Sequence, residues 1–185
     1  MRRYKPVGTK SLKGGNMERE FSKQLSLWWS DGQHDDWFWR TAGSGGRATN
    51  RGKKGQSTVN AAGDIGAMCG EAQRLLNVVT IECKRGYNKT DIQELLDHKG
   101  KSQFREFIEQ AQASASLAGT PFFWLVIQRD RRHRLLFTNN KSPFTHLVYI
   151  DCQYGCMYTA DEFFSHNALK AYYRDLTHSF SSGVR

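Results

Sequence analysis

An acid in one predicted strand and a Glu-x-Lys sequence in the next restrict the possible folds of this chain more than any other feature. Residues 77–84 are rich in β-branched side chains, and side chains alternate along a strand, so Glu82 and Lys84 share one face. Asp64 belongs to the strand predicted just before, over residues 62–68. Buried charges at the end of an apolar strand are costly unless something compensates them. We therefore expect Asp64, Glu82 and Lys84 to meet around a bound divalent cation.

This donor set suits the hydrolysis of a phosphodiester. Mg²⁺ prefers oxygen ligands and is usually held by one or two carboxylates together with substrate phosphate. Asp64 and Glu82 would supply the carboxylates, and the main-chain carbonyl of Cys83 a third oxygen. Lys84 would orient or deprotonate the attacking water, or stabilise charge on the phosphate. For an isolated Glu-x-Lys, the alternative is a salt bridge at a strand end.

The net charge points to a polyanionic partner. The chain has 27 Lys and Arg residues against 18 Asp and Glu, which gives a formal charge of +9. Membrane attachment explains this excess less well, because the sequence has no long apolar run. We expect a cytoplasmic protein that binds nucleic acid.

The length of 185 residues suits one domain. We expect a basic, flexible N-terminal arm over residues 1–15 and a single domain over 16–185, with a core of about 17–128 and an extension over 129–185. Residues 43–60 have no apolar period and form a long basic loop.

The predicted elements give an α/β fold with a mixed central sheet flanked by helices. The first helix begins after Asn16, and Glu18 lies close to its apolar stripe, either as a capping charge or as a further metal ligand. Residues 62–68 and 77–84 would form a hairpin, and Leu135 would begin an edge strand. We expect helices over residues 17–30, 91–99, 102–118 and 161–176, and strands over 37–40, 62–68, 77–84, 122–127, 135–137 and 146–150.

This order of motifs resembles the PD-(D/E)xK nuclease superfamily, and within it the archaeal-type Holliday-junction resolvases. The resemblance covers about residues 17–128. It rests on the acids and lysine above, on Glu18-Arg19-Glu20 at the start of the first helix, and on the turn from Arg40 to Ser44 and Gly45. Gly63 stands where the superfamily name has Pro. The resemblance implies a restriction-endonuclease-like fold.

The resemblance also implies roles for individual residues. Glu18, Asp64 and Glu82 would bind Mg²⁺, with Mn²⁺ as a possible substitute, and Lys84 would be the catalytic lysine. Ser44 matches a mobile-loop serine tied to catalysis. A polar residue on the following helix could be Gln110 or Gln112, and the spacing does not choose between them. The expected DNA contacts are Arg40, Arg47, Arg51, Lys53, Lys54, Arg85 and Lys89, with further contacts possible from the turn that holds Arg129, Arg131, Arg132 and Arg134.

The expected function is therefore a Mg²⁺-dependent endonuclease that cuts branched DNA as a homodimer. Its compact basic form would suit a phage recombination or genome-processing enzyme, acting in the cytoplasm of a cell or of an infected host. The aromatics of residues 37–39 or of the last helix could form the dimer face, although we expect them in the core. One alternative is a restriction-like or repair nuclease on duplex or flap DNA. A second is a non-catalytic DNA-binding protein that keeps the fold.

Overall fold

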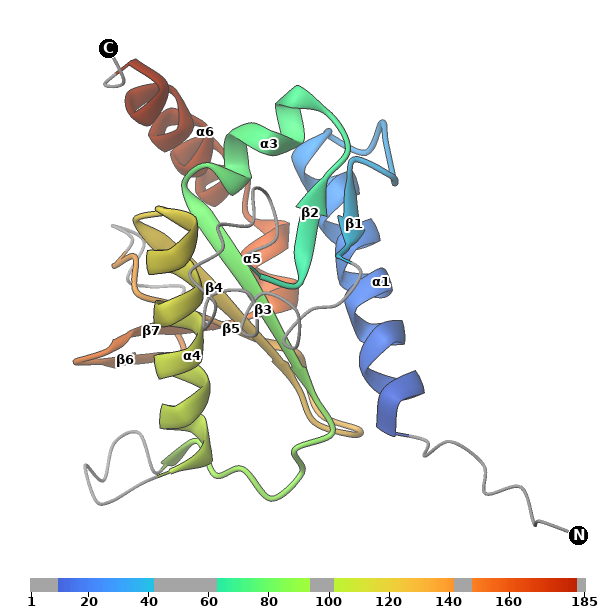
Figure 1. Ribbon diagram of the computed structural model, residues 1–185, viewed down its shortest axis with the longest axis vertical. Coiled ribbons are helices and arrows are strands. Elements are labelled where there is room, and N and C mark those ends of the chain that lie inside the picture. Colours follow the sequence, from blue (N-terminus) through green and yellow to red (C-terminus); the bar gives the residue numbers. More distant parts are fainter. Residues whose placement is uncertain (1–9, 42–62, 94–101, 142–147, 183–185) are drawn as a thin grey trace, which may run out of the picture.

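A mixed five-stranded sheet forms the centre of the protein, with helices on both faces (Figure 1). The computed structural model describes residues 10–41, 63–93, 102–141 and 148–182. The sheet has the order β3-β4-β5-β7-β6, and a separate two-stranded sheet pairs β1 with β2. The elements are α1 (Lys10–Trp29), β1 (Phe38–Arg40), β2 (Ile65–Ala67), α3 (Gly70–Leu76), β3 (Val79–Arg85), α4 (Gln103–Ala118), β4 (Phe122–Gln128), β5 (Leu135–Thr138), β6 (Ile150–Cys152), β7 (Gly155–Thr159), α5 (Ala160–Ser165) and α6 (Asn167–Ser182).

The parallel pair of β3 and β4 connects the candidate site to the core. Parallel neighbours require a long crossover, and α4 provides it. The continuous apolar run of β4 is buried on both faces, as predicted, because Trp124 packs on one side and Leu125 on the other. β3 lies at the edge of the five-stranded sheet, so one of its two edges has no strand partner in that sheet.

Two apolar clusters fill the two sides of the sheet. On one side, α4 packs through Phe104, Ile108 and Ala111 against β4 and β5. On the other side, α1, α3, α5 and α6 surround Trp124 of β4. Figure 1 shows α4 in front of the sheet and α1 along its other flank. Since Glu82 and Lys84 lie on the α4 side, the odd-numbered residues of β3 face α1.

A buried serine fixes the β1–β2 pair against α1. The hydroxyl of Ser26 donates to the carbonyl of Ser22 at 2.8 Å and accepts from the main-chain N–H of Phe38 at 2.9 Å. The buried stripe of α1 includes Phe21 and Leu25, as predicted, and this stripe turns Glu18 inward. The same contacts bring Arg40, the last residue of β1, to the N-terminal half of the described helix.

Several sequence predictions about these elements are wrong. α1 begins at Lys10, so Asn16 lies inside the helix and does not cap it. The hairpin predicted across residues 69–76 does not form, because α3 occupies that segment and β2 pairs with β1. Good helix formers such as Glu71 and Leu75 account for this helix. The helix predicted over residues 91–99 lies largely outside the described residues.

The C-terminal third also differs from expectation. β5 is not an edge strand, because it pairs with β4 on one side and with β7 on the other. The strand predicted over residues 146–150 begins only at Ile150 as β6, and β7 was not predicted. The last helix is two helices separated by His166, whose extended backbone ends α5. Within residues 129–141 and 148–182, the strands β5 and β7 and the helices α5 and α6 thus contribute to the main core.

We predict that Ser26→Ala destabilises the protein by about 1–3 kcal/mol, because the buried N–H of Phe38 loses its acceptor. Urea unfolding followed by circular dichroism measures the change. Ser116→Ala on the exposed side of α4 is the matched control and should leave the free energy of unfolding nearly unchanged. Equal stability of the two variants would contradict the proposed anchoring of β1 by Ser26.

Candidate active site

Asp64 closes the unpaired edge of β3. Its main-chain N–H donates to the carbonyl of Ile81 at 2.7 Å, and its Oδ2 accepts from the N–H of Cys83 at 2.7 Å. The amide of Cys83 lies between Glu82 and Lys84 in the chain, so this bond places the Asp64 carboxylate beside both residues. The N–H and carbonyl of one strand residue point to the same edge, so the carbonyl of Cys83 also faces Asp64.

Gly63 lets the chain come this close to β3. Its φ of +87° lies in the left-handed region, and a Cβ at this position would be 2.7 Å from the carbonyl oxygen of Ile81. Proline, whose φ is near −65°, could not adopt this conformation. Thr41 holds the turn from the other side, because its hydroxyl donates to the Gly63 carbonyl at 3.0 Å. The glycine is therefore required by the backbone of this chain.

Glu82 is buried on the α4 side of β3 and has two polar neighbours. The hydroxyl of Ser114 donates to its Oε1 at 2.7 Å, and the ammonium of Lys84 lies 3.6 Å from its Oε2. The Lys84 ammonium also lies 5.7 Å from the centre of the Phe107 ring. Glu82 and Lys84 thus share one face of β3, as the strand alternation predicts.

Sequence reasoning missed Ser114. The candidates considered on this helix, Gln110 and Gln112, are both exposed on α4. The available signal was the spacing of seven residues from the buried Phe107, which places Ser114 on the same face two turns later. The Ser114 side chain reaches from α4 to Glu82 on β3.

Glu18 approaches from α1 and is paired with Arg40. The carboxylate is buried, while Glu20 is exposed, as the helix periodicity predicts. The Nε of Arg40 donates to its Oε2. Arg40 was predicted as a DNA contact, and the structure gives it this further role of neutralising Glu18.

The three carboxylates interact electrostatically. Burial, and next the charge of Asp64, raise the pKa of Glu82 from its ordinary value of 4.5 to about 7, against the opposing effects of Lys84 and Ser114. Burial, and next Asp64, also raise the pKa of Glu18, although Arg40 and Lys84 act in the opposite direction. Asp64 is therefore close enough to both glutamates to disfavour their charged forms.

The acids do not form a compact three-carboxylate cluster. Among the residues that the structure describes, no three His, Cys, Asp or Glu side chains are arranged to hold one metal ion together. The structure instead shows three separate contacts. The Asp64 carboxylate accepts from the N–H of Cys83, the residue that follows Glu82, and Lys84 lies next to Glu82. Glu18 is paired with Arg40.

The other predicted contacts fall into three groups. Arg85 ends β3 half-buried, and Lys89 is exposed in the following turn. Arg134 is not a surface phosphate ligand: it is only 14% exposed, and it donates to Gln24 at 2.7 Å. The remaining positions, Ser44, Arg47, Arg51, Lys53 and Lys54, lie outside the described residues.

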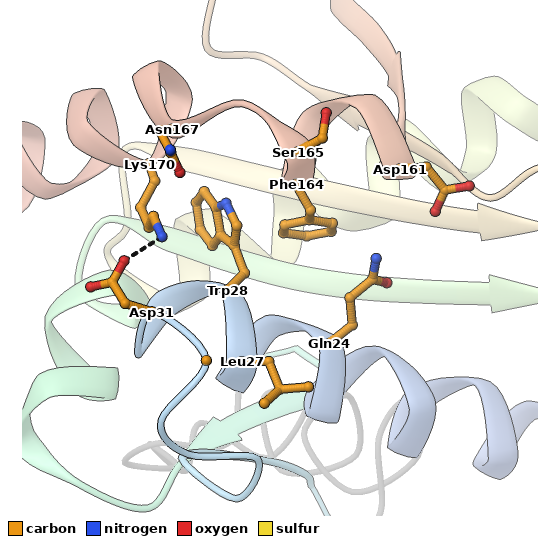
Figure 2. Close-up of a pocket in the computed structure, with 10 residues that line it drawn as sticks. Gln24, Leu27, Trp28, Asp31, Asp161, Phe164, Ser165, Asn167 and Lys170 are labelled. Atoms are coloured by element: carbon orange, nitrogen blue, oxygen red, sulfur yellow. Dashed lines mark hydrogen bonds and ion pairs between the residues drawn. The ribbon is translucent and has the colours of Figure 1, made fainter.

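An open hollow of about 610 Å³ lies elsewhere, between α1 and the C-terminal helices (Figure 2). The rings of Trp28 and Phe164 line it, and Lys170 pairs with Asp31 at its margin. None of the candidate catalytic residues lines this hollow. The arrangement of charged groups at β3, not the size of a cavity, therefore identifies the candidate site.

The fold and the site together define a class. A mixed sheet flanked by helices, with an acid beside the edge strand and Glu-x-Lys on that strand, is the arrangement of PD-(D/E)xK nucleases. The profile of the family described as "Phage putative PDDEXK endonuclease" matches residues 9–170, and the chain belongs to this family. Asp64, Glu82 and Lys84 lie within the matched part.

Searches of curated proteins and of solved structures found no match. Within the described ranges, none of the helices combines the length and the apolar character needed to cross a membrane.

We predict that Gly63→Ala lowers the free energy of unfolding by about 2 kcal/mol or more. The added Cβ would adopt an unfavourable φ and press on the Ile81 carbonyl. Thermal or urea unfolding checks this change. Gly70→Ala at the start of α3 is the control, because its Cβ meets nothing within 4 Å. Equal free energies of unfolding for the two variants would show that Gly63 does not lie this close to β3.

We predict that ionisation of Glu82 lowers the free energy of unfolding of the metal-free protein as the pH rises. Because its folded pKa is about 7 and its ordinary value is 4.5, the folded state holds the proton more tightly. The associated stability is present below pH 4.5 and is lost as the pH rises through 7. Relative to Glu82→Gln, the wild type should lose on the order of 2–3 kcal/mol between pH 5 and pH 8.

Urea unfolding in EDTA at both pH values measures this difference. Glu106→Gln, at an exposed position of the neighbouring helix α4, is the control and should follow the wild type. A constant difference between wild type and Glu82→Gln across this range would show that Glu82 is not held as the structure has it.

Proposed function

We propose that this protein is a Mg²⁺-dependent endonuclease that hydrolyses DNA phosphodiesters, with branched DNA such as a Holliday junction as its substrate. The observation that carries the proposal is the bond from the Cys83 N–H to Asp64 Oδ2 at 2.7 Å. It fixes one carboxylate against the peptide that joins Glu82 to Lys84, so an acid pair and a lysine occupy one place. Membership of a nuclease family supports hydrolysis as the reaction.

The residues present fit a divalent cation. Asp64 and Glu82 offer carboxylate oxygens, and the Cys83 carbonyl faces the same edge of β3. Buried acids that raise one another's pKa are the groups that a cation would stabilise in charged form. Two carboxylates with substrate phosphate are the usual set for Mg²⁺, for which Mn²⁺ can substitute. When bound, the metal would lower the pKa of a water and screen charge on the phosphate.

The protein groups have separate roles in this proposal. Lys84, held near Glu82 and above Phe107, orients or deprotonates the attacking water, or stabilises the phosphate oxygens. Ser114 fixes one oxygen of Glu82 and so positions the other. Glu18 completes the acidic set from α1, and Arg40 limits the repulsion among the acids. Ser44, which lies outside the described residues, remains a proposed catalytic residue.

Branched DNA is proposed on the resemblance of residues 18–20 and 40–45 to the resolvase branch, and Glu18 and Arg40 in that set contact each other. A junction has two opposed strands to cut, which a two-fold homodimer would do with one site for each strand. The proposed setting is recombination, repair or genome processing by a phage, in the cytoplasm of the infected host. The positively charged chain, at +9, supports a DNA partner.

We predict that Asp64→Asn lowers DNA cleavage by at least about 100-fold, because the variant loses a metal-binding charge but keeps an acceptor for the Cys83 N–H. Four-way junction, flap, nicked and linear duplex DNA are incubated with the wild type in Mg²⁺, in Mn²⁺ and in EDTA. Asp175→Asn, at an exposed position of α6, is the matched control and should cut like the wild type.

Each outcome separates the candidate functions. Paired symmetric cuts in the junction that need metal and Asp64 support the proposal. Equal cutting of linear duplex or flaps replaces the substrate with that of a restriction-like or repair nuclease. Tight binding without any cutting in either metal ion would leave a DNA-binding protein and end the proposal of catalysis.

A further inference from the structure

Two turns at one end of the β3–β4 pair are joined into a single tip. The side chain of Asn88 donates to Asp130 at 3.0 Å, and the N–H of Asp130 donates back to Asn88 at 2.8 Å. Arg129 donates to the carbonyl of Thr90 at 3.1 Å. In Figure 1 these turns lie together at the lower end of β3. We call residues 85–90 and 129–134 the basic tip.

The basic tip is strongly positive, and its outermost charges are exposed. It contains six Lys and Arg residues and a single acid, Asp130, whose carboxylate accepts from Asn88. Lys89, Arg131 and Arg132 are exposed. Within the described ranges, no acid lies within ion-pair distance of these three side chains.

The backbone conformation of Arg131 differs from that of the other charged residues of the basic tip. Its φ of +58° is unfavourable for a residue with a Cβ, and only one other described non-glycine residue, Asp31, has a positive φ. Asp31 is paired with Lys170 and Arg174 inside the protein. Arg131 lies in the turn between β4 and β5, where the N–H of Arg132 donates to the carbonyl of Arg129 at 3.3 Å, and this turn accounts for its positive φ. The turn thus holds Arg131 in one backbone conformation with its side chain exposed.

The basic tip begins at the candidate active site. Arg85 follows Lys84 directly, and the Tyr87 ring lies 4.7 Å from the same Phe107 ring that the Lys84 ammonium approaches. Seven residues separate Glu82 from Lys89, which an extended chain spans in at most about 23 Å. One turn of duplex DNA is longer, about 34 Å. A duplex with a phosphate at Lys84 would therefore also pass over the basic tip.

We propose that the basic tip is a rigid clamp for the DNA backbone beside the cleavage point, with Arg131 and Arg132 as its principal phosphate contacts. This inference rests on the proposed nuclease function. The clamp is formed before binding, because hydrogen bonds within the protein hold its two turns together. Contacts to phosphate fix the position of the duplex and carry no sequence preference.

The test measures binding of a fluorescent four-way junction to the full chain in EDTA, at salt concentrations from 50 to 200 mM. Arg132→Gln should weaken binding about three- to tenfold and reduce the slope of log K against log salt by about 1. Arg74→Gln on α3 is the matched control, since it removes the same charge from an exposed position outside the tip. It should leave the affinity and slope unchanged.

Arg131→Gly separates binding from folding. Glycine accepts the positive φ, so the thermal midpoint should stay equal or rise, while the affinity and the salt slope fall as for Arg132→Gln. Wild-type binding by both tip variants would overturn the clamp, as would an equal loss in Arg74→Gln. Cleavage by the wild type is measured in parallel: if it cuts DNA while tip variants bind normally, only the clamp fails. If it binds through the tip and never cuts in either metal ion, the nuclease proposal fails, and the tip is overturned as a clamp beside a cleavage point and is a DNA-binding surface only.

Discussion

The candidate site depends on how the free edge of β3 is closed. An edge strand presents unpaired N–H and carbonyl groups that need partners. Here a single residue, Asp64, pairs with β3 through its main-chain N–H and through its carboxylate. The position of the carboxylate is consequently fixed by backbone hydrogen bonding, and Gly63 provides the close approach. The same two hydrogen bonds of Asp64 therefore close the sheet edge and place its carboxylate beside Glu82 and Lys84.

Glu18 and Glu82 at this edge each have a basic partner, but the charges of the acids still disfavour one another. Arg40 is paired with Glu18. Ser114 donates a hydrogen bond to Glu82, and Lys84 forms an ion pair with it. The pKa values of both glutamates are nevertheless raised, because burial and Asp64 outweigh these partners. Apolar side chains at these positions would give a sheet of equal or greater stability. The arrangement is therefore better explained by a bound cation and substrate than by the stability of the fold.

Local patterns predicted the elements whose neighbours are close in sequence or whose pattern is unambiguous. β3, α4 and β4 follow from β-branched, helical and continuous apolar runs, and these predictions are confirmed. The errors concern pairing between distant segments: β2 joins β1 rather than β3, and β5 is central. In the site, strand alternation placed Glu82 with Lys84, whereas Ser114 and Arg40 required knowledge of how α4 and α1 pack on the sheet. Sequence periodicity predicts which face of a helix or strand is buried, but it does not identify the element that packs on that face.

The strand that carries the candidate site depends on packing by elements that follow residue 128, which the sequence analysis placed outside the core. Trp124 is paired with Ile81 of β3, so it lies directly beside the strand that carries the site. Its indole N–H donates to Tyr173 at 3.0 Å, and the ring packs edge-on against Phe163 and Tyr173. A chain ending near residue 128 would expose this ring and leave β4 without β5. The family match extends to residue 170 and includes α5, which agrees with this packing. β5, α5 and α6 therefore support β4, and through β4 they hold β3 in place for the chemistry proposed at its edge.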